Sequence, residues 1–230
     1  IIISIIPARG GSKGIPKKNI KKFLGIPLIN HSIKYSLSSK KITKTFVTTD
    51  DPEIKKIAQK AGASIINRPK EIADDNATTE SAIKHALSNI DLNPDIIILL
   101  QPTSPFRPIN SLDNAIDYFV NNNFDSLLSI SPTHNFIWKI SDKLALPQYD
   151  FLNRSRRQDI KNEDINYIEN GSLYIFTKNH FIKHHNRLGG KIGYIIFDEQ
   201  FSKEIDSELD FTILEKINKK FNSWSLFFLT

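Results

Sequence analysis

The sequence has 230 residues, of which 40% are hydrophobic, and a formal net charge of +6 at pH 7. This length suits one domain with a sizeable core, or one domain with a protruding segment. There is no cysteine, which excludes disulfides and thiolate metal sites. The basic residues form no stripe interleaved with aromatic residues, so we expect no nucleic-acid partner.

Both ends of the sequence are apolar but too short to span a bilayer. The opening run, Ile1–Ile6, has no basic segment before it and no cleavage site after it, so it does not resemble a signal peptide. We assign no function to the final run, residues 224–230. We therefore expect no membrane partner and a cytoplasmic location.

Strand-like and helix-like stretches alternate along the first 130 residues. Continuous apolar or β-branched runs predict strands, and apolar residues at helical spacing predict helices. The expected strands are 1–6, 43–48, 63–66, 95–100 and 126–130, and the expected helices are 27–39, 51–61, 78–90 and 109–120. This rhythm predicts a three-layer α/β/α, doubly wound domain with a mainly parallel sheet.

The alternation stops at about residue 132. Residues 132–168 are polar and aromatic, with a hairpin-like stretch at 136–146, and we read them as an excursion within a single domain spanning 1–230. The excursion is suited to packing on a partner subunit. Strands are expected again at 172–176 and 192–197, and a closing helix at 210–221.

The loop after the first strand has the composition of a phosphate-binding loop. Ile6-Pro-Ala-Arg-Gly-Gly-Ser-Lys-Gly-Ile-Pro-Lys-Lys-Asn19 combines three glycines, which let the backbone approach a ligand, with Arg9, Lys13 and Lys18. It matches neither the Walker A pattern nor the dinucleotide G-x-G-x-x-G fingerprint. From the residues alone, a phosphate or nucleotide site is predicted; a flexible turn with solvated lysines is the structural alternative.

This loop resembles the opening signature of the acylneuraminate cytidylyltransferase (CMP-sialic acid synthetase) family. The resemblance continues in order through Thr48-Thr49-Asp50-Asp51, Asn67-Arg68-Pro69, Gln101–Arg107, Arg157-Gln158, Asn170-Gly171 and Ile205–Asp210. It implies a nucleotide-diphospho-sugar transferase-like fold and a homodimer. It also implies transfer of CMP from CTP to the anomeric hydroxyl of a nonulosonic acid, with release of pyrophosphate.

The resemblance assigns roles residue by residue. Arg9 and Lys18 are implied to hold the triphosphate and to be catalytic, together with Asp206. The implied nucleotide-binding residues are Arg9, Gly11, Ser12, Lys13, Lys18, Asn19 and, at the cytosine end, Arg68. The implied sugar-binding residues are Gln101, Arg157, Gln158 and Asn170. For Arg68 the alternative is a surface arginine after an edge strand, and for Arg157 it is a solvated basic patch.

An acidic segment near the end of the chain is the candidate metal site. In an extended segment Glu204 and Asp206 project to the same side, where two carboxylates can hold Mg²⁺ with phosphate oxygens and water. The alternative is an acidic helix start with the acids in the first turn. The resemblance favours Asp206 as a metal ligand, with Glu204 as the second.

Two departures from the family pattern leave the acceptor open. The family commonly has Asp-Ile-Asp where this chain has Glu204-Ile205-Asp206, and Arg-Pro-Asn-Gly where it has Ile168-Glu169-Asn170-Gly171. Legionaminic, pseudaminic or another sugar acid is therefore an alternative to N-acetylneuraminate. A non-catalytic anion-binding relative and an inactive relative are the further alternatives. No general base is identified.

Overall fold

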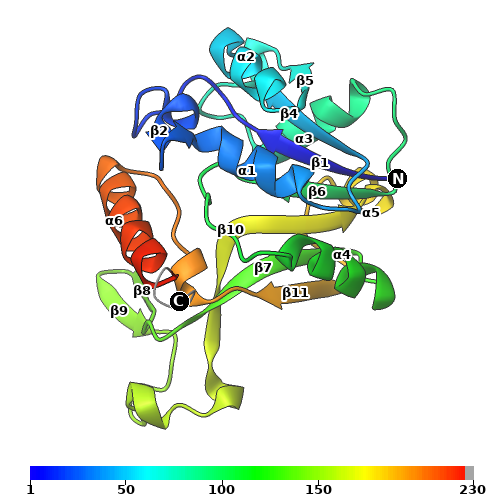
Figure 1. Ribbon diagram of the computed structural model, residues 1–230. Coiled ribbons are helices and arrows are strands. Elements are labelled where there is room, and N and C mark those ends of the chain that lie inside the picture. Colours follow the sequence, from blue (N-terminus) through cyan, green and yellow to red (C-terminus); the bar gives the residue numbers. More distant parts are fainter. Residues whose placement is uncertain (226–230) are drawn as a thin grey trace.

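A seven-stranded sheet forms the centre of the molecule (Figure 1). The computed structural model describes residues 1–225, and all of their side chains except those of 157, 162 and 218–225. The neighbouring strands are, in order, β11 (Ile192–Ile196), β7 (Ser126–Thr133), β10 (Asn166–Thr177), β6 (Ile96–Leu100), β1 (Ile2–Pro7), β4 (Lys44–Thr49) and β5 (Ser64–Asn67).

The sheet is mainly parallel, as predicted. Strands β6, β1, β4 and β5 run parallel to one another, and β11 is parallel to β7. Among the strands that the structure describes in this sheet, only β10 is antiparallel, to both β6 and β7. Strand β10 begins at Asn166, earlier than the expected residue 172, and its pairing with β7 shifts register between Glu169 and Tyr174. The irregularity places residues 169–171 at the edge of the sheet where β6 ends.

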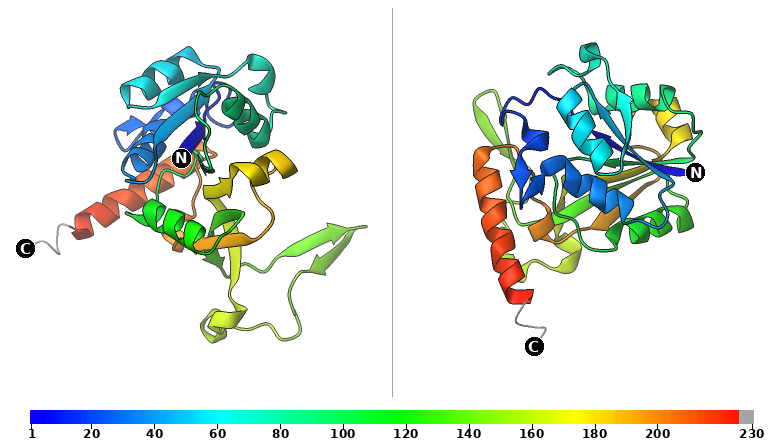
Figure 2. Two further views of the ribbon diagram at one scale, coloured as in Figure 1. Left: turned by 90° about the vertical axis from the view of Figure 1, so that its right-hand side faces the viewer. Right: turned by 45° about the horizontal axis from the view of Figure 1, so that its top comes forward.

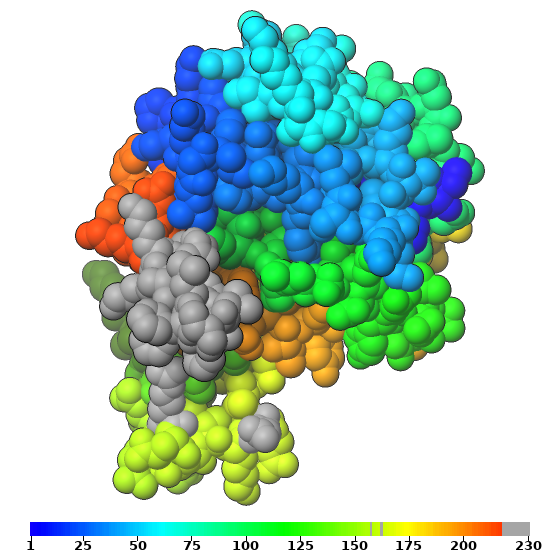
Figure 3. All heavy atoms as spheres, in the orientation of Figure 1, coloured from blue at the N-terminus to red at the C-terminus, as the bar shows by residue number. Residues whose placement is uncertain are grey.

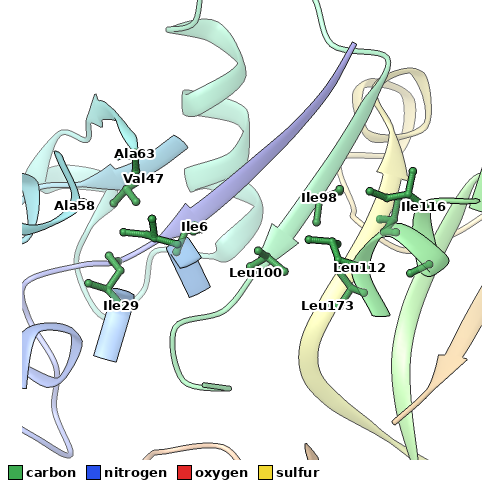
Figure 4. Packing of buried hydrophobic residues seen from close by; sticks show 14 of the residues in the cluster. Ile6, Ile29, Val47, Ala58, Ala63, Ile98, Leu100, Leu112, Ile116 and Leu173 are labelled. Atoms are coloured by element: carbon green, nitrogen blue, oxygen red, sulfur yellow. The ribbon is translucent and has the colours of Figure 1, made fainter. Parts of the chain in front are cut away.

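Helices cover both faces of the sheet, which confirms the three-layer prediction (Figure 2). One face packs against α1 (Leu28–Leu37), α2 (Pro52–Lys60) and α4 (Ser111–Asn121), and the other against α3 (Thr79–Ser88) and α5 (Lys178–His184). Strand β1 is buried on both faces, since Ile6 packs with the first group and Ile3 and Ile5 with the second. Figure 4 shows Ile6 with residues from neighbouring strands and helices.

A third, smaller cluster lies beside the glycine loop. Helix α6 (Glu208–Ser225) contributes Phe211 and Leu214, which pack with Ile15 of the loop and with Ile205. The short hairpin β2 (Lys22–Phe23) and β3 (Ile26–Pro27) completes the cluster with Phe23. The C-terminal segment is thereby held against the N-terminal loop by apolar burial.

The expected hairpin is present in the excursion, as β8 (Trp138–Ser141) and β9 (Leu144–Pro147). The excursion projects from the sheet as a separate lobe (Figures 1 and 3). The structure adds helix α5, which was not predicted; the Thr177 side chain caps it by accepting from the His180 N–H. The 3₁₀ turns are Lys18–Ile20, Lys70–Ile72, Arg157–Asp159, Asn162–Asp164 and Glu199–Phe201.

None of the helices that the structure describes has both the length and the apolar character needed to cross a membrane. Residues 226–230 of the apolar terminal run lie outside the described residues.

Candidate active site

The glycine loop leaves β1 at the carboxyl edge of the sheet and is fixed on both sides. The Gly10 N–H donates to Asp50 Oδ1 at 3.0 Å, and a Cβ on Gly10 would lie 2.7 Å from an oxygen of Asp51. A Cβ on Gly14 would lie 2.5 Å from the carbonyl oxygen of Asp206. At Gly11, by contrast, a Cβ would meet nothing within 4 Å. The loop is therefore packed at its flanks and open at its centre, where a ligand can approach.

A cleft of about 270 Å³ lies beside the loop. It brings together residues from the ends of β1, β5 and β6 and from the start of α3. Its lining residues are Pro7, Arg9, Ser12, Lys18, Asn19, Arg68, Asp75, Ala77, Thr78, Thr79, Gln101, Pro102 and Thr103. Six of the side chains predicted from the sequence to bind nucleotide or sugar thus line one cleft, at the edge where α/β sheets bind ligands.

Arg9 and Lys13 face an acidic segment that the sequence analysis did not single out. Arg9 Nη1 donates to the Asp74 carbonyl at 2.5 Å and lies 2.9 Å from Asp75 Oδ1. Lys13 Nζ lies 3.0 Å from Asp75 Oδ2, and this bond holds the pKa of the Asp75 carboxyl below its usual range, with Arg9 adding to the effect. In the sequence, the feature that could have indicated this segment is the acidic pair Asp74-Asp75, shortly before Thr78, which caps α3.

Arg68 is a buried cation with unused hydrogen-bond donors. Its backbone N–H is tied to the Thr49 carbonyl at 2.9 Å, and the residue is only 8% exposed. Its Nε and Nη2 have no partner among the described residues. Burial lowers the pKa of the guanidinium; the Asp50 charge opposes this and the Arg9 charge adds to it. The alternative of a solvated surface arginine is therefore wrong, and an acceptor on a ligand would satisfy the free donors.

Lys18 joins the two ends of the chain. Its side chain is 14% exposed, and Nζ donates to Asp206 Oδ1 at 3.0 Å and to the Ile205 carbonyl at 3.1 Å. Its neighbour Asn19 is buried, and its Nδ2 donates to the Arg9 carbonyl at 2.9 Å. Asn19 therefore braces the loop as well as lining the cleft.

The acidic pair lies in a segment without regular secondary structure, just before α6. Ile205 is fully buried and its N–H donates to the Thr103 carbonyl at 2.8 Å, so the segment is fixed between its two carboxylates. Glu204 accepts from Ser104 Oγ at 3.3 Å. Burial raises the pKa of Glu204, and the neighbouring Asp206 charge raises it further. The helix-start alternative is wrong for both residues, because α6 begins only at Glu208.

The carboxylates of Glu204 and Asp206 are close enough for the Asp206 charge to raise the pKa of Glu204. Two carboxylates suit Mg²⁺, which prefers few protein oxygens and keeps water or phosphate as its other ligands. Among the described residues, no group of three or more His, Cys, Asp or Glu side chains is arranged to hold a metal. A site built by Glu204 and Asp206 would therefore need oxygens from the substrate.

The predicted sugar-binding residues are not all in one place. Gln101 lines the cleft. Asn170 is buried, with Oδ1 accepting from Ser129 Oγ at 2.5 Å and Nδ2 donating to Ser131 Oγ at 3.0 Å, so it braces β10 against β7. Gln158 is exposed on the excursion and does not line the described cleft. The Arg157 side chain lies outside the described residues.

Arg107 fixes the strand end that carries Gln101. It is buried, and Nη2 donates to the Gln101 carbonyl at 2.8 Å and to the Ser172 carbonyl at 2.9 Å. Burial lowers its pKa to about 10. The sequence motif included Arg107, but its role as a clamp between β6 and β10 depends on strand neighbours that the sequence does not reveal.

Comparison with known proteins agrees with this geometry. A family model described as cytidylyltransferase matches residues 3–216. The chain is 34% identical over 220 residues to N-acylneuraminate cytidylyltransferase A of Danio rerio, covering 94% of this chain and 50% of that protein. It is also 34% identical over 225 residues to the N-acylneuraminate cytidylyltransferase of Escherichia coli O18:K1:H7, covering 96% and 53%.

Two solved structures share the fold. CMP:2-keto-3-deoxy-manno-octonic acid synthetase complexed with CTP matches with a TM-score of 0.71 at 14% identity, over 95% of this chain and 98% of that one. The 4-diphosphocytidyl-2C-methyl-D-erythritol synthase of Anaerococcus prevotii matches with a TM-score of 0.68 at 12% identity, over 95% and 96%.

The chain spans about half the length of the curated relatives it matches. The family model, however, covers nearly all of the chain. The chain therefore belongs to the cytidylyltransferase family of nucleotidyltransferase enzymes and is similar, within it, to the N-acylneuraminate cytidylyltransferases.

Proposed function

We propose that the protein transfers CMP from CTP to the anomeric hydroxyl of a sialic-acid-like nonulosonic acid and releases pyrophosphate. The observation that carries this proposal is one cleft that collects a glycine loop, the cations Arg9, Lys18 and Arg68, and Gln101. The acidic pair lies beside it, through the contact of Lys18 with Asp206. The names of the relatives supply the substrate class.

In this reaction the anomeric hydroxyl gives up its proton to water while its oxygen forms a bond to the α-phosphorus, and the bond from that phosphorus to the pyrophosphate oxygen breaks. Negative charge moves onto the leaving pyrophosphate. Arg9 and Lys18 both line the cleft, and they would hold the triphosphate and neutralise this charge, which is the main protein contribution to phosphoryl-type transfer. Ser12 and Lys13 lie in the same loop, and the buried donors of Arg68 suit the nucleoside end.

We propose Mg²⁺ as the cofactor, held by Asp206 with Glu204 as second ligand. Bound there, Mg²⁺ would add positive charge next to the phosphates. Asp206 would then contact both Lys18 and the ion, so that both positive charges would lie near the leaving pyrophosphate.

Incubation with CTP, Mg²⁺ and a panel of acceptors tests the function. We expect pyrophosphate release with N-acetylneuraminate, legionaminate or pseudaminate, and loss of release after chelation with EDTA. Release with 2-keto-3-deoxy-manno-octonate alone would contradict the proposed acceptor class. Release that persists at full rate in EDTA would contradict the metal assignment.

Replacing Lys18 should lower turnover more than stability. For Lys18→Met we expect kcat to fall roughly 10²-fold, because one donor to the developing charge is lost. The free energy of unfolding should change by about 1 kcal/mol or less, the usual size for such an ion pair. Lys17→Met is the matched control, since Lys17 is an exposed loop lysine paired with Glu53 at 2.7 Å. Equal kcat in both variants would refute the role of Lys18.

Replacing Arg68 should weaken ligand binding without lowering the stability of the fold. For Arg68→Met we expect CTP to bind roughly tenfold to a hundredfold more weakly in titration calorimetry, the usual cost of losing hydrogen bonds from a charged group. The melting temperature should stay level or rise, because the variant removes a buried cation with unsatisfied donors. Lys55→Met, at a nearby cation that donates to Asn67 at 3.0 Å, is the control. Unchanged CTP affinity together with a lower melting temperature would contradict a binding role for Arg68 and indicate a structural role instead.

We also propose that two copies associate through the excursion. Its hairpin exposes Trp138, Ile140, Leu144 and Leu146, and Ile140 is 71% exposed. Neighbouring exposed apolar side chains on a projecting lobe mark an interaction surface. A second copy would cover them, and it would give Gln158 a route to the cleft of a neighbouring chain.

Light scattering tests this association. We expect a particle mass of twice 26.3 kDa for the chain described here, and a shift toward one copy for Ile140→Lys. Lys139→Ser, a polar change on the same hairpin, should leave the mass unchanged. A monomer at all concentrations would exclude the proposed dimer.

A further inference from the structure

One wall of the cleft is formed by a short segment that leads into α3, residues 74–79. Four of its residues line the cleft, namely Asp75, Ala77, Thr78 and Thr79. Its two carboxylates are used differently. Asp74 Oδ1 accepts from the N–H groups of Asn76 and Ala77, at 3.0 and 2.8 Å, and so stabilises the turn itself. The Asp75 carboxylate instead contacts the glycine loop.

The Asp75 carboxylate bridges two cations of that loop. Oδ1 lies 2.9 Å from Arg9 Nη1, and Oδ2 lies 3.0 Å from Lys13 Nζ. Each carboxylate oxygen thus has one cation as its partner, as two oxygens of a phosphate group would. Between these cations in the sequence is Gly11, where the loop is open. A carboxylate of the protein itself therefore occupies two cations of the proposed phosphate-binding loop.

This contact is weak enough for a ligand to displace it. The side chain of Asp75 is 44% exposed and that of Lys13 is 76% exposed. Ion pairs so accessible to water contribute little to stability. A pyrophosphate or triphosphate group carries more negative charge and more acceptor oxygens than one carboxylate. Such a ligand can replace Asp75 while the turn keeps its shape, because Asp74 stabilises the turn from within.

Asp75 disfavours a bound phosphate whether it stays or moves. Its bond to Lys13 keeps the pKa of its carboxyl below the usual range, with Arg9 adding to the effect, so the group is an anion at neutral pH. A phosphate on the same two cations would lie close to this charge, and like charges at short distance repel. Moving the carboxylate away breaks both of its ion pairs. Either way, polyphosphate binds more weakly than Arg9 and Lys13 alone would allow.

We propose that Asp75 is an internal competitor that the polyphosphate of the substrate displaces and that returns to Arg9 and Lys13 when pyrophosphate leaves. The chain keeps the carboxylate beside these cations, so its effective concentration there is high. This competition lowers the affinity for substrate and product alike. Pyrophosphate has no nucleoside to hold it, so its release gains most. The part in product release rests on the proposed function, whereas the competition for anions does not.

Calorimetric titration with inorganic tripolyphosphate and with pyrophosphate, in buffer free of Mg²⁺, tests the competition without catalysis. We expect Asp75→Asn and Asp75→Ala to lower the Kd for both anions roughly fivefold, because two partly exposed ion pairs no longer compete. Asp75→Glu keeps the charge and should not tighten binding. Glu53→Gln is the control for net charge, since Glu53 pairs with Lys17 of the same loop at 2.7 Å and is not among the cleft residues. It should leave both Kd values unchanged.

Steady-state rates test the part in product release. In Asp75→Asn and Asp75→Ala, added pyrophosphate should inhibit CMP transfer at a concentration roughly fivefold lower than in the unmodified protein. An unchanged inhibition constant would contradict a role for Asp75 in release.

The outcomes separate this inference from its rivals. Unchanged or weaker anion binding by Asp75→Asn and Asp75→Ala would overturn it, and weaker binding would indicate that Asp75 positions Arg9 for the ligand. Tightening by Asp75→Asn alone, or to the same extent by Glu53→Gln, would also overturn it, because an added amide donor or the net charge would then be the cause. The absence of anion binding by every variant would contradict it as well. Anion binding as expected, without pyrophosphate release for any sugar acid, would reject only the proposed function.

Discussion

Burial of Ile205 against the glycine loop and α6 is the constraint on which the site depends. The residue is fully buried with Ile15 and Phe211, and its N–H is bonded to the carbonyl of Thr103. Apolar burial and a backbone hydrogen bond together fix an otherwise irregular segment. The carboxylates on either side of Ile205 are thereby held beside a loop almost two hundred positions earlier in the chain, and Lys18 contacts one of them directly.

The cations of the cleft differ in whether the protein provides each of them with a carboxylate partner, and this difference bears on ligand binding. Arg9 and Lys18 each have a carboxylate partner, so their side chains are held in place before a ligand binds. Arg68 is buried with donors unsatisfied by the protein. Such a group reduces stability unless a ligand supplies acceptors, which is the usual signature of a site selected for binding. The nucleotide that we propose as substrate carries hydrogen-bond acceptors of this kind.

The antiparallel strand β10 is anchored to both of its neighbouring strands next to the candidate site. Arg107 clamps its Ser172 carbonyl to the end of β6, and Asn170 braces it against β7. Gly171 lies between these anchors, and a Cβ there would meet the carboxylate of Glu204. Strand β10 thereby supports the strand end that carries Gln101, which we propose to contact the acceptor, whereas most residues that we propose for nucleotide binding lie on a loop. Rigid support favours discrimination between similar sugars, because small displacements weaken oriented hydrogen bonds.

Local pattern in the sequence determined most of the strands, all of the helices except α5, and the glycine loop, because buried strands, helix caps and glycine-rich turns are set by neighbouring residues. It also indicated Arg9, Lys18 and the pair Glu204 and Asp206. Only the tertiary structure decided what depends on contacts between distant segments: the antiparallel course of β10, the Arg107 clamp, and the contact of Asp75 with Arg9 and Lys13. Strand order and packing between layers set these contacts, and neither has a local sequence signal.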